Sequence, residues 1–243
     1  MQRKSTFRSW LGALLYLTGV LLGLALSASI AWGDSEAGLY TSNNADTGLR
    51  LNCPYMLAPN ERGIVSAKIT NLSNEEIQPV VTAQISHANF PREVEQTIHL
   101  RAKESKTVEW AFDSSDAIFG HLIVINVNQA RYRDDPSRFG SCGVLLFNLY
   151  GLAGVQTFGL LFAISLITMF FGGRLWLKER RQPLSEFSIN LAQISKALMV
   201  IATLALLSMF PRWWGLTLVL DALILLVMGV IFTDFLLLSK YKN

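Results

Sequence analysis

The sequence is short of the residues that most catalytic and metal-binding sites need. Its 243 residues include two cysteines and three histidines. There is no Cys-x-x-Cys pair and no histidine at ligand spacing beside either cysteine, which argues against a zinc or dithiol redox site. Glycine-rich phosphate loops are absent, and no serine, cysteine or carboxylate stands in a recognisable nucleophile context. The sequence therefore predicts no enzyme activity, no cofactor and no metal site.

Charged residues are also few, at 16% of the chain, whereas hydrophobic residues make up 51%. The net charge of +3 is divided unevenly, because residues 33–150 hold 10 Lys or Arg against 14 Asp or Glu, a net charge of −4. No basic stripe interleaved with exposed aromatic residues occurs in this block. Nucleic acid is therefore not an expected partner.

Four long apolar stretches dominate what is present. They lie at about residues 9–32, 151–171, 189–210 and 213–238. Each reaches the roughly 20 residues that an α-helix needs to cross a bilayer. We therefore predict a multi-pass protein of the cell membrane, with lipid as one partner and one polar domain between the first two helices.

Basic residues predict the orientation of the chain. They precede the first stretch, follow the second and close the tail: Arg3, Lys4 and Arg8; Arg174, Lys178, Arg180 and Arg181; Lys240 and Lys242. The positive-inside rule places these segments, and both termini, in the cytoplasm, so residues 33–150 are expected outside it. Five tryptophans flank the stretches, where amphipathic rings prefer the headgroup layer: Trp10, Trp32, Trp176, Trp213 and Trp214.

The first stretch has two interpretations. It has the basic start and small-residue end, Ser27 to Ala31, of a signal peptide cut before Trp32. However, its apolar run of about 22 residues exceeds the usual signal core. Gly19, Gly23, Ser27 and Ala31 also recur at every fourth position, which puts four small side chains on one face for helix packing. We favour a retained helix, and either interpretation leaves residues 33–150 extracytoplasmic.

The two cysteines, Cys53 and Cys142, stand near the beginning and the end of the extracytoplasmic block. A single pair in an oxidising compartment predicts a disulfide. Closing a loop of this size would stabilise the domain by about 4 kcal/mol on the chain-entropy model.

The block between the cysteines has a period-two hydrophobic pattern, which is typical of strands with one buried face. Seven strands are expected, near residues 47–53, 65–70, 81–85, 94–100, 108–112, 119–128 and 140–149. His87, His99 and His121 fall on different parts of this pattern, and residues 33–48 have the composition of a mobile linker. Seven short strands over about 110 residues predict an immunoglobulin-like antiparallel sandwich.

One segment carries a resemblance to a known family. The run Leu57-Ala58-Pro59-Asn60-Glu61, followed by residues 65–74, resembles the opening strands of bacterial immunoglobulin-like modules of the cell-adhesion-related (CARDB-like) type. In those modules a proline-glycine-glutamate turn precedes a strand that ends in Asn, and Asn60 stands here in place of the glycine. The resemblance implies a non-catalytic spacer or binding surface, and it brings no active-site residues. The four apolar stretches resemble no family that we can name.

Five polar residues interrupt the second to fourth apolar stretches: Gln156, Gln193, Lys196, Asp221 and Asp234. Charges in hydrocarbon cost about 3 kcal/mol, so they normally find partners or water. In an antiparallel hairpin of the last two helices, Asp234 lies within a turn of Lys196, whereas Asp221 has no charged partner. Asp221 is then expected to face water, the second helix near Gln156, or another subunit.

The sequence thus predicts an α+β membrane protein with four transmembrane helices, the first either retained or a cleaved signal peptide, and one extracytoplasmic immunoglobulin-like antiparallel β-sandwich. The expected segments are 1–32, 33–150, 151–171, a cytoplasmic loop at 172–188, a helical hairpin at 189–238 and a cytoplasmic tail at 239–243. The expected function is non-enzymatic: protein–protein interaction or assembly of a complex with another membrane or envelope protein. The alternative is a small transporter or channel-like subunit that uses Asp221 and Gln156. The oligomeric state is not predicted.

Overall fold

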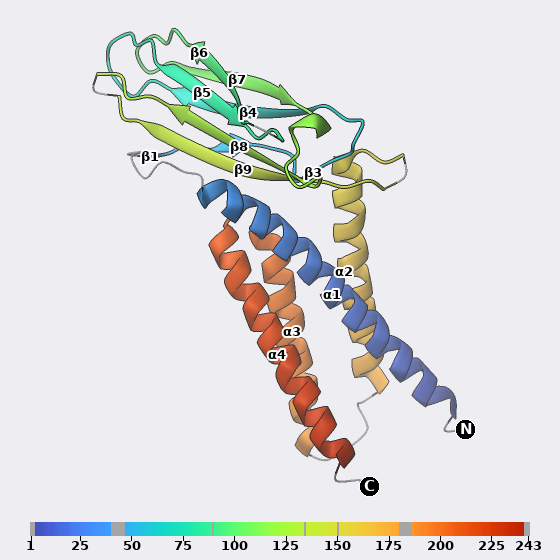
Figure 1. Ribbon diagram of the computed structural model, residues 1–243. Coiled ribbons are helices and arrows are strands. Elements are labelled where there is room, and N and C mark those ends of the chain that lie inside the picture. The colour runs from blue at the N-terminus through green and yellow to red at the C-terminus, as the bar shows by residue number, and fades with distance from the viewer. Residues whose placement is uncertain are drawn as a thin grey trace. The chain divides into compact units, whose positions relative to one another are not determined.

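A computed structural model divides the chain into two compact units (Figure 1). The helical unit comprises residues 1–31 and 159–243, and the strand unit comprises residues 32–158. The structure describes residues 3–39, 47–88, 90–133, 135–149, 151–179 and 186–240, apart from the side chains of residues 3–7, 9, 179, 186–192 and 231–240. Both unit boundaries fall inside helices, so the first two helices contribute to both units.

All four apolar stretches form helices. These are α1 (Arg3–Leu39), α2 (Gly154–Glu179), α3 (Glu186–Ser208) and α4 (Trp214–Lys240). Among the described residues, two segments are long and apolar enough to cross a membrane, and two apolar segments are shorter: Trp10–Leu39 and Gly154–Lys178, then Gln193–Ser208 and Trp214–Val230. The α2 helix runs eight residues beyond its predicted end at 171, because basic residues can continue a helix past the apolar region that hydropathy detects.

The strand unit contains two sheets, which make the fold α+β. The strands are β1 (Thr47–Gly48), β2 (Leu51–Asn52), β3 (Met56–Leu57), β4 (Gly63–Thr70), β5 (Val80–Ile85), β6 (Arg92–Thr97), β7 (Ser105–Phe112), β8 (Leu122–Gln129) and β9 (Arg138–Leu146). One sheet has the order β1-β9-β8-β5-β6, with β3 also paired to β9, and the other has the order β2-β4-β7. Among the described strands, β1 and β3 pair in parallel with β9, and the other pairs are antiparallel. Each of the seven predicted strand segments overlaps a strand, and β3 was not predicted.

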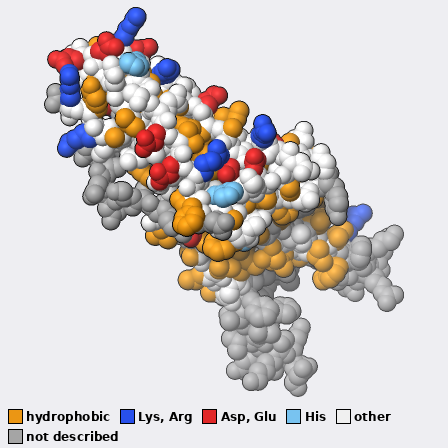
Figure 2. Space-filling view, turned by 45° about the horizontal axis from the view of Figure 1, so that its top comes forward, with side chains coloured by type: hydrophobic (Ala, Val, Ile, Leu, Met, Phe, Trp, Pro, Cys, Tyr) orange, Lys and Arg blue, Asp and Glu red, His pale blue; other side chains and the backbone are white. Residues whose placement is uncertain are grey.

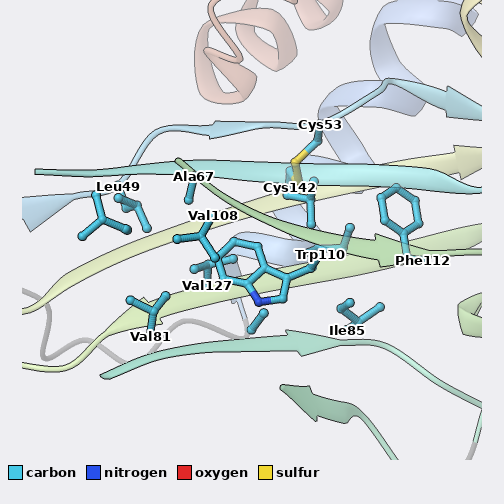
Figure 3. Close-up of a cluster of buried hydrophobic side chains, with 14 of the residues drawn as sticks. Leu49, Cys53, Ala67, Val81, Ile85, Val108, Trp110, Phe112, Val127 and Cys142 are labelled. Atoms are coloured by element: carbon cyan, nitrogen blue, oxygen red, sulfur yellow. A yellow bond between two sulfur atoms is a disulfide. The ribbon is translucent and has the colours of Figure 1, made fainter. Parts of the chain in front are cut away.

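The period-two pattern produces a core that the two sheets share (Figure 3). Alternate residues of β4 and β7 from one sheet and of β5 and β8 from the other are buried in it: Val65, Ala67 and Ile69; Val108, Trp110 and Phe112; Val81, Ala83 and Ile85; Ile123, Ile125 and Val127. Their neighbours in β4 and β7 are exposed or half-buried. Burial of one face of each strand therefore holds the sheets together.

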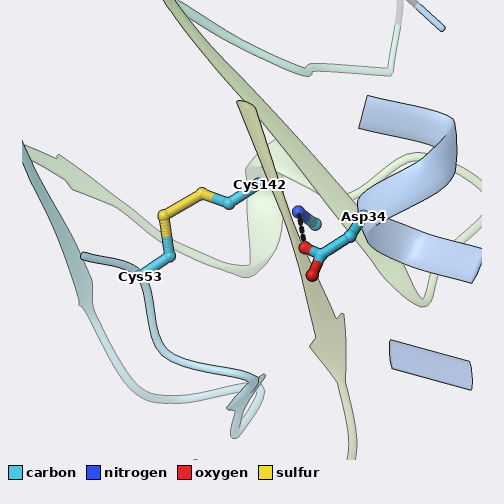
Figure 4. Close-up of a disulfide and its surroundings, with 4 residues drawn as sticks. Asp34, Cys53 and Cys142 are labelled. Carbon is cyan, nitrogen blue, oxygen red and sulfur yellow. Dashed lines mark hydrogen bonds between the residues drawn. A yellow bond between two sulfur atoms is a disulfide. The ribbon is translucent and has the colours of Figure 1, made fainter. Parts of the chain in front are cut away.

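A disulfide joins the two sheets across this core. Cys53 directly follows β2 of the three-stranded sheet, and Cys142 lies in β9 of the six-stranded sheet, 89 residues away (Figure 4). Trp110 is buried in the same core (Figure 3). The bond thus links the segment that follows β2 to β9, the last strand of the unit.

The end of α1 packs on the strand unit, where the sequence predicts a linker. Residues 33–39 continue α1, and residues 40–46 lie outside the described part of the chain. Ala37 is fully buried against Leu122 and Val124 of β8. The physical reason is that β8 has apolar residues on both faces. One face is buried in the core between the sheets, and the other, with Leu122 and Val124, is buried by the end of α1.

Two polar contacts fix this helix end. The buried carboxylate of Asp34 accepts a hydrogen bond from the Gly143 backbone N–H at 3.0 Å (Figure 4). The Asn126 amide, in the orientation that satisfies both of its atoms, donates to the Ala37 carbonyl at 3.1 Å. A Cβ atom on Gly143 would overlap the backbone of Gly33, so glycine is needed here for close approach of helix and sheet.

Replacing Cys53 and Cys142 together by alanine should lower the free energy of unfolding by about 4 kcal/mol, because the unfolded chain loses a large closed loop. Denaturant unfolding of the detergent-solubilised protein measures this change. The unmutated protein treated with reductant is the control and should behave like the double variant. Equal stability of the oxidised protein and the double variant would contradict a structural role for the bond.

Gly143→Ala should destabilise the strand unit by about 1–3 kcal/mol, the usual cost of overpacking. The matched control is Gly48→Ala, since no atom lies within 4 Å of a Cβ placed at Gly48 in β1. Circular dichroism of thermal unfolding in detergent distinguishes the two variants. An unchanged melting temperature for Gly143→Ala would mean that α1 does not dock closely on β9.

Candidate functional site

Polar side chains of the helical unit make hydrogen bonds between helices. The Tyr16 hydroxyl of α1 donates to the Ser195 carbonyl of α3 at 2.8 Å, and the Ser165 hydroxyl of α2 donates to the Gly19 carbonyl of α1 at 2.9 Å. All three side chains are buried. Where water is scarce, such bonds stabilise helix association modestly and fix which faces meet.

Asp221 of α4 takes part in one of these contacts. Its Oδ1 atom accepts a hydrogen bond from the Ser27 hydroxyl of α1 at 2.8 Å, and its side chain is 4% exposed. Its Oδ2 atom is buried without a hydrogen-bond partner among the described residues. The sequence leaves the partner of Asp221 open among water, the second helix and another subunit, whereas the structure places a serine of the first helix there. The sequence predicts Ser27 only as a small residue for helix packing. Its hydroxyl, which can donate a hydrogen bond to a buried carboxylate, was the signal that could have identified the partner of Asp221.

The four small residues of α1 lie on a packed face. A Cβ atom on Gly19 would come within 2.5 Å of the Met169 backbone nitrogen, and one on Gly23 within 2.8 Å of the Ser165 Oγ atom. Ser27 and Ala31 on the same face are buried. Glycine therefore allows α2 to approach α1 more closely than larger residues would.

The other predicted intramembrane polar residues have local roles or lie at the surface. Gln156 is exposed, and its Oε1 atom accepts from the Ala153 backbone N–H at 3.2 Å, which caps the start of α2. Gln193 and Lys196 are exposed on α3. The side chain of Asp234, the predicted partner of Lys196, lies outside the described residues.

The five predicted belt tryptophans are not alike. Trp10, Trp213 and Trp214 are exposed, as a headgroup position requires. Trp176 is partly buried and packs on Tyr16, with ring centroids 5.7 Å apart. Trp32 belongs to the strand unit, where its exposed ring stacks on His121 at 6.2 Å.

The strand unit has a polar hollow of about 320 Å³, lined in part by Arg62, His87, Arg92, Asp113 and Asp116. Asp116 is buried and well supplied with partners, since Arg92 lies 3.2 Å away, His87 3.8 Å away and the Asp113 backbone N–H donates at 3.0 Å. The Ser115 side chain and backbone donate to Asp113 and hold its pKa below the usual value. These bonds build the turn that follows β7 and give both carboxylates of the lining hydrogen-bond partners.

Among the described residues, no three His, Cys, Asp or Glu side chains cluster as a metal site would need. Carboxylates instead hold the fold together. Glu61 accepts from the backbone N–H groups of Ala58 and Gly154, at 3.0 and 2.7 Å, and so caps the start of α2. Buried Asp135 pairs with Arg138 at 3.0 Å and accepts from Gln129. Glu61 and Asp135 therefore have structural roles in the strand unit.

No family model matches the sequence, and no protein of curated function matches it. Solved structures match part of it. A cycloisomaltooligosaccharide glucanotransferase from Paenibacillus, in complex with cycloisomaltoheptaose, has a TM-score of 0.35 and 13% identity over 42% of this chain, which spans 14% of that protein. A β-glucosidase from Listeria innocua in complex with isofagomine has a TM-score of 0.30 and 18% identity over 40% of this chain and 16% of that one.

A smaller protein is matched over nearly its whole length. The CARDB domain of a Pyrococcus furiosus protein, in complex with di-metal ions, has a TM-score of 0.32 and 15% identity over 44% of this chain and 99% of that one. It is the type of module that residues 57–74 resemble. At TM-scores of 0.30 to 0.35, none of these matches assigns a family or an activity to this chain.

Proposed function

We propose that this chain is a multi-pass membrane protein that presents an extracytoplasmic immunoglobulin-like sandwich, residues 33–150, and that it serves without catalysis as a binding or bracing subunit of a membrane complex. Its partner would be another membrane or envelope protein. Both chain termini would lie in the cytoplasm.

The main support for membrane embedding is that the helical unit exposes large apolar side chains and buries polar ones. Large apolar side chains are turned outward, including Ile167 at 65% and Leu226 at 63% exposed, whereas Ser27, Ser165 and Asp221 are buried between helices. Figure 2 shows hydrophobic side chains gathered over the helices and charged ones scattered over the strand unit. An apolar exterior around hydrogen-bonded polar groups is unfavourable in water and fits hydrocarbon.

The contacts of α1 support a retained first helix rather than a cleaved signal peptide. Tyr16 and Val20 belong to the helical core, together with residues of α2, α3 and α4. Loss of residues 1–31 would leave Asp221 buried without the Ser27 hydroxyl and would expose the face of α2 at Gly172. A transient targeting segment would not need such contacts.

The orientation follows from charge. Arg174 and Lys178 are exposed in the last turns of α2, on the side that the positive-inside rule assigns to the cytoplasm. The strand unit, which precedes α2, is then extracytoplasmic, where a disulfide between Cys53 and Cys142 persists.

The transporter alternative receives less support. It requires Asp221 and Gln156 to line one water-accessible cavity, but Asp221 is 4% exposed and bonded to Ser27, whereas Gln156 caps the start of α2. These separate contacts favour structural roles for both residues.

A double-mutant cycle on Ser27→Ala and Asp221→Asn tests this structural role. Hydrogen bonds between membrane helices contribute about 0.6 kcal/mol on average, so we expect a coupling energy between about 0.5 and 2 kcal/mol for thermal or denaturant unfolding in detergent. The matched control is Ser29→Ala, because Ser29 is exposed and, among the described residues, its hydroxyl donates to the Ala25 carbonyl of its own helix rather than to another helix. Additive effects of Ser27→Ala and Asp221→Asn would contradict the contact, as would a mature protein that begins at Trp32.

Purification of the full chain from its native membrane in mild detergent tests the complex. We expect a second membrane or envelope protein to co-elute in a fixed ratio and to remain bound when the salt concentration is raised, since the proposed contact is a stable assembly. Quantitative mass spectrometry of the eluted fractions measures the ratio. A solitary, homogeneous protein would contradict the subunit role.

A further inference from the structure

Both connections between the two units leave the strand unit at one end, which we call the linked end. Trp32, the first residue of the strand unit, stacks on His121 at the start of β8. A Cβ atom on Gly154, at the start of α2, would meet Met56, which pairs with Leu145 at the end of β9. Because Leu145 also pairs with the first residue of β8, these positions lie together.

The exposed apolar side chains of the strand unit gather at the linked end. They come from the chain connections and from the loops and strand ends there: Trp32, Ile64, Phe90, Phe119, Phe147 and Val155. Away from the linked end, the described large apolar residues of the strand unit that are exposed are Leu39, at the end of α1, and Leu72 and Val80 at the opposite end. That end instead carries exposed charges: Glu75, Glu76, Arg101, Lys103, Glu104 and Lys106. The linked end thus carries most of the exposed large apolar side chains of the strand unit, beside the charged hollow that Arg62 and Arg92 line.

The Phe119 turn shows that this exposure is built into the backbone. Ile118 and Leu122 bridge the turn and pack in the cluster around Ala37, so the base of the turn is fixed. At its tip, Phe119 has a φ of 53° and is 74% exposed, followed by Gly120 with a φ of 72°. A bulky residue in the left-handed region costs about 1–3 kcal/mol. The chain therefore holds an aromatic ring outward in an unfavourable conformation, which burial of the ring by a partner would offset.

The position of this turn indicates what the partner is. Trp32 directly follows the apolar run of α1, and Val155 lies in the first turn of α2. If those helices cross a bilayer, both residues stand at its surface. Phe119 is close to Trp32 through His121, whose ring centroid lies 6.4 Å from that of Phe119 and 6.2 Å from that of Trp32. Aromatic rings at this depth favour the headgroup layer.

We propose that the linked end is a lipid-contacting surface, in which the Phe119 turn inserts into the headgroup layer of the bilayer that α1 and α2 cross. This inference rests on the proposed membrane embedding. It adds a contact between the strand unit and the membrane, beyond the two covalent connections.

Spin-label accessibility tests this surface in the full chain. Phe119→Cys and Leu72→Cys are each labelled with a nitroxide, with the native disulfide intact, and reconstituted into phosphatidylcholine vesicles. Leu72 is the matched control because it is also exposed, at 54%, but lies at the end opposite to the linked end. Relaxation by molecular oxygen, which concentrates in lipid, relative to relaxation by a water-soluble nickel chelate should be several-fold higher at position 119 than at position 72.

A third label, at Ile167→Cys on the exposed face of α2, separates the two proposals. Lipid-like values at positions 167 and 119 support both. Lipid-like values at 167 with water-like values at 119 overturn the lipid contact and leave the membrane embedding intact. Low accessibility to both reagents at 119 also overturns it, because the ring would then be covered by protein. Water-like values at 167 contradict the proposed membrane embedding itself.

Discussion

The hydrogen bond from the Gly143 N–H to the buried Asp34 carboxylate is the constraint on which the attachment of the first helix depends. A carboxylate removed from water is costly unless it is well bonded, so this pair holds the end of α1 in one position on β9. The bond requires close approach, and the paired glycines Gly33 and Gly143 permit it. From this position follow the burial of Ala37 on β8 and the stacking of Trp32 on His121.

The two units have opposite distributions of polar and apolar side chains between interior and surface. In the strand unit, apolar side chains face a common core and charges face outward, as water demands. In the helical unit, buried serines, a tyrosine and Asp221 bond across helices while leucine, isoleucine and phenylalanine face outward. Hydrogen bonds between polar groups therefore determine which helix faces meet in the helical unit, and burial of apolar side chains determines which sheet faces meet in the strand unit. A single chain with both arrangements is stable where one unit lies in water and the other in hydrocarbon, and this is the physical argument for the proposed membrane topology.

Much of the fold could be predicted because its signals are periodic and local. Alternation along β4 and β7 identified the strands, and the isolated pair Cys53 and Cys142 pointed to the disulfide that the structure contains. The helix end at residues 33–39 could not be found this way, because its Gly, Ser, Asp and Glu composition matches a linker. Its signal lay elsewhere, in the continuous apolar run Leu122–Ile125, which indicates a strand covered on both faces. The contact between Ser27 and Asp221 is equally non-local, at 194 residues apart.

The two ends of the strand unit also bear on whether it displays a binding surface or braces a partner. A domain that is merely displayed needs only a tether, and a flexible one suffices. Here the first connection is a helix bonded to β9 through Asp34, and the second begins with α2 capped by Glu61. Both connections are bonded to the strand unit, and the disulfide between Cys53 and Cys142 cross-links the part of the chain that lies between them. Within the strand unit, the end of α1 and the start of α2 are therefore fixed by hydrogen bonds rather than joined by slack chain, which supports the proposed bracing role over display.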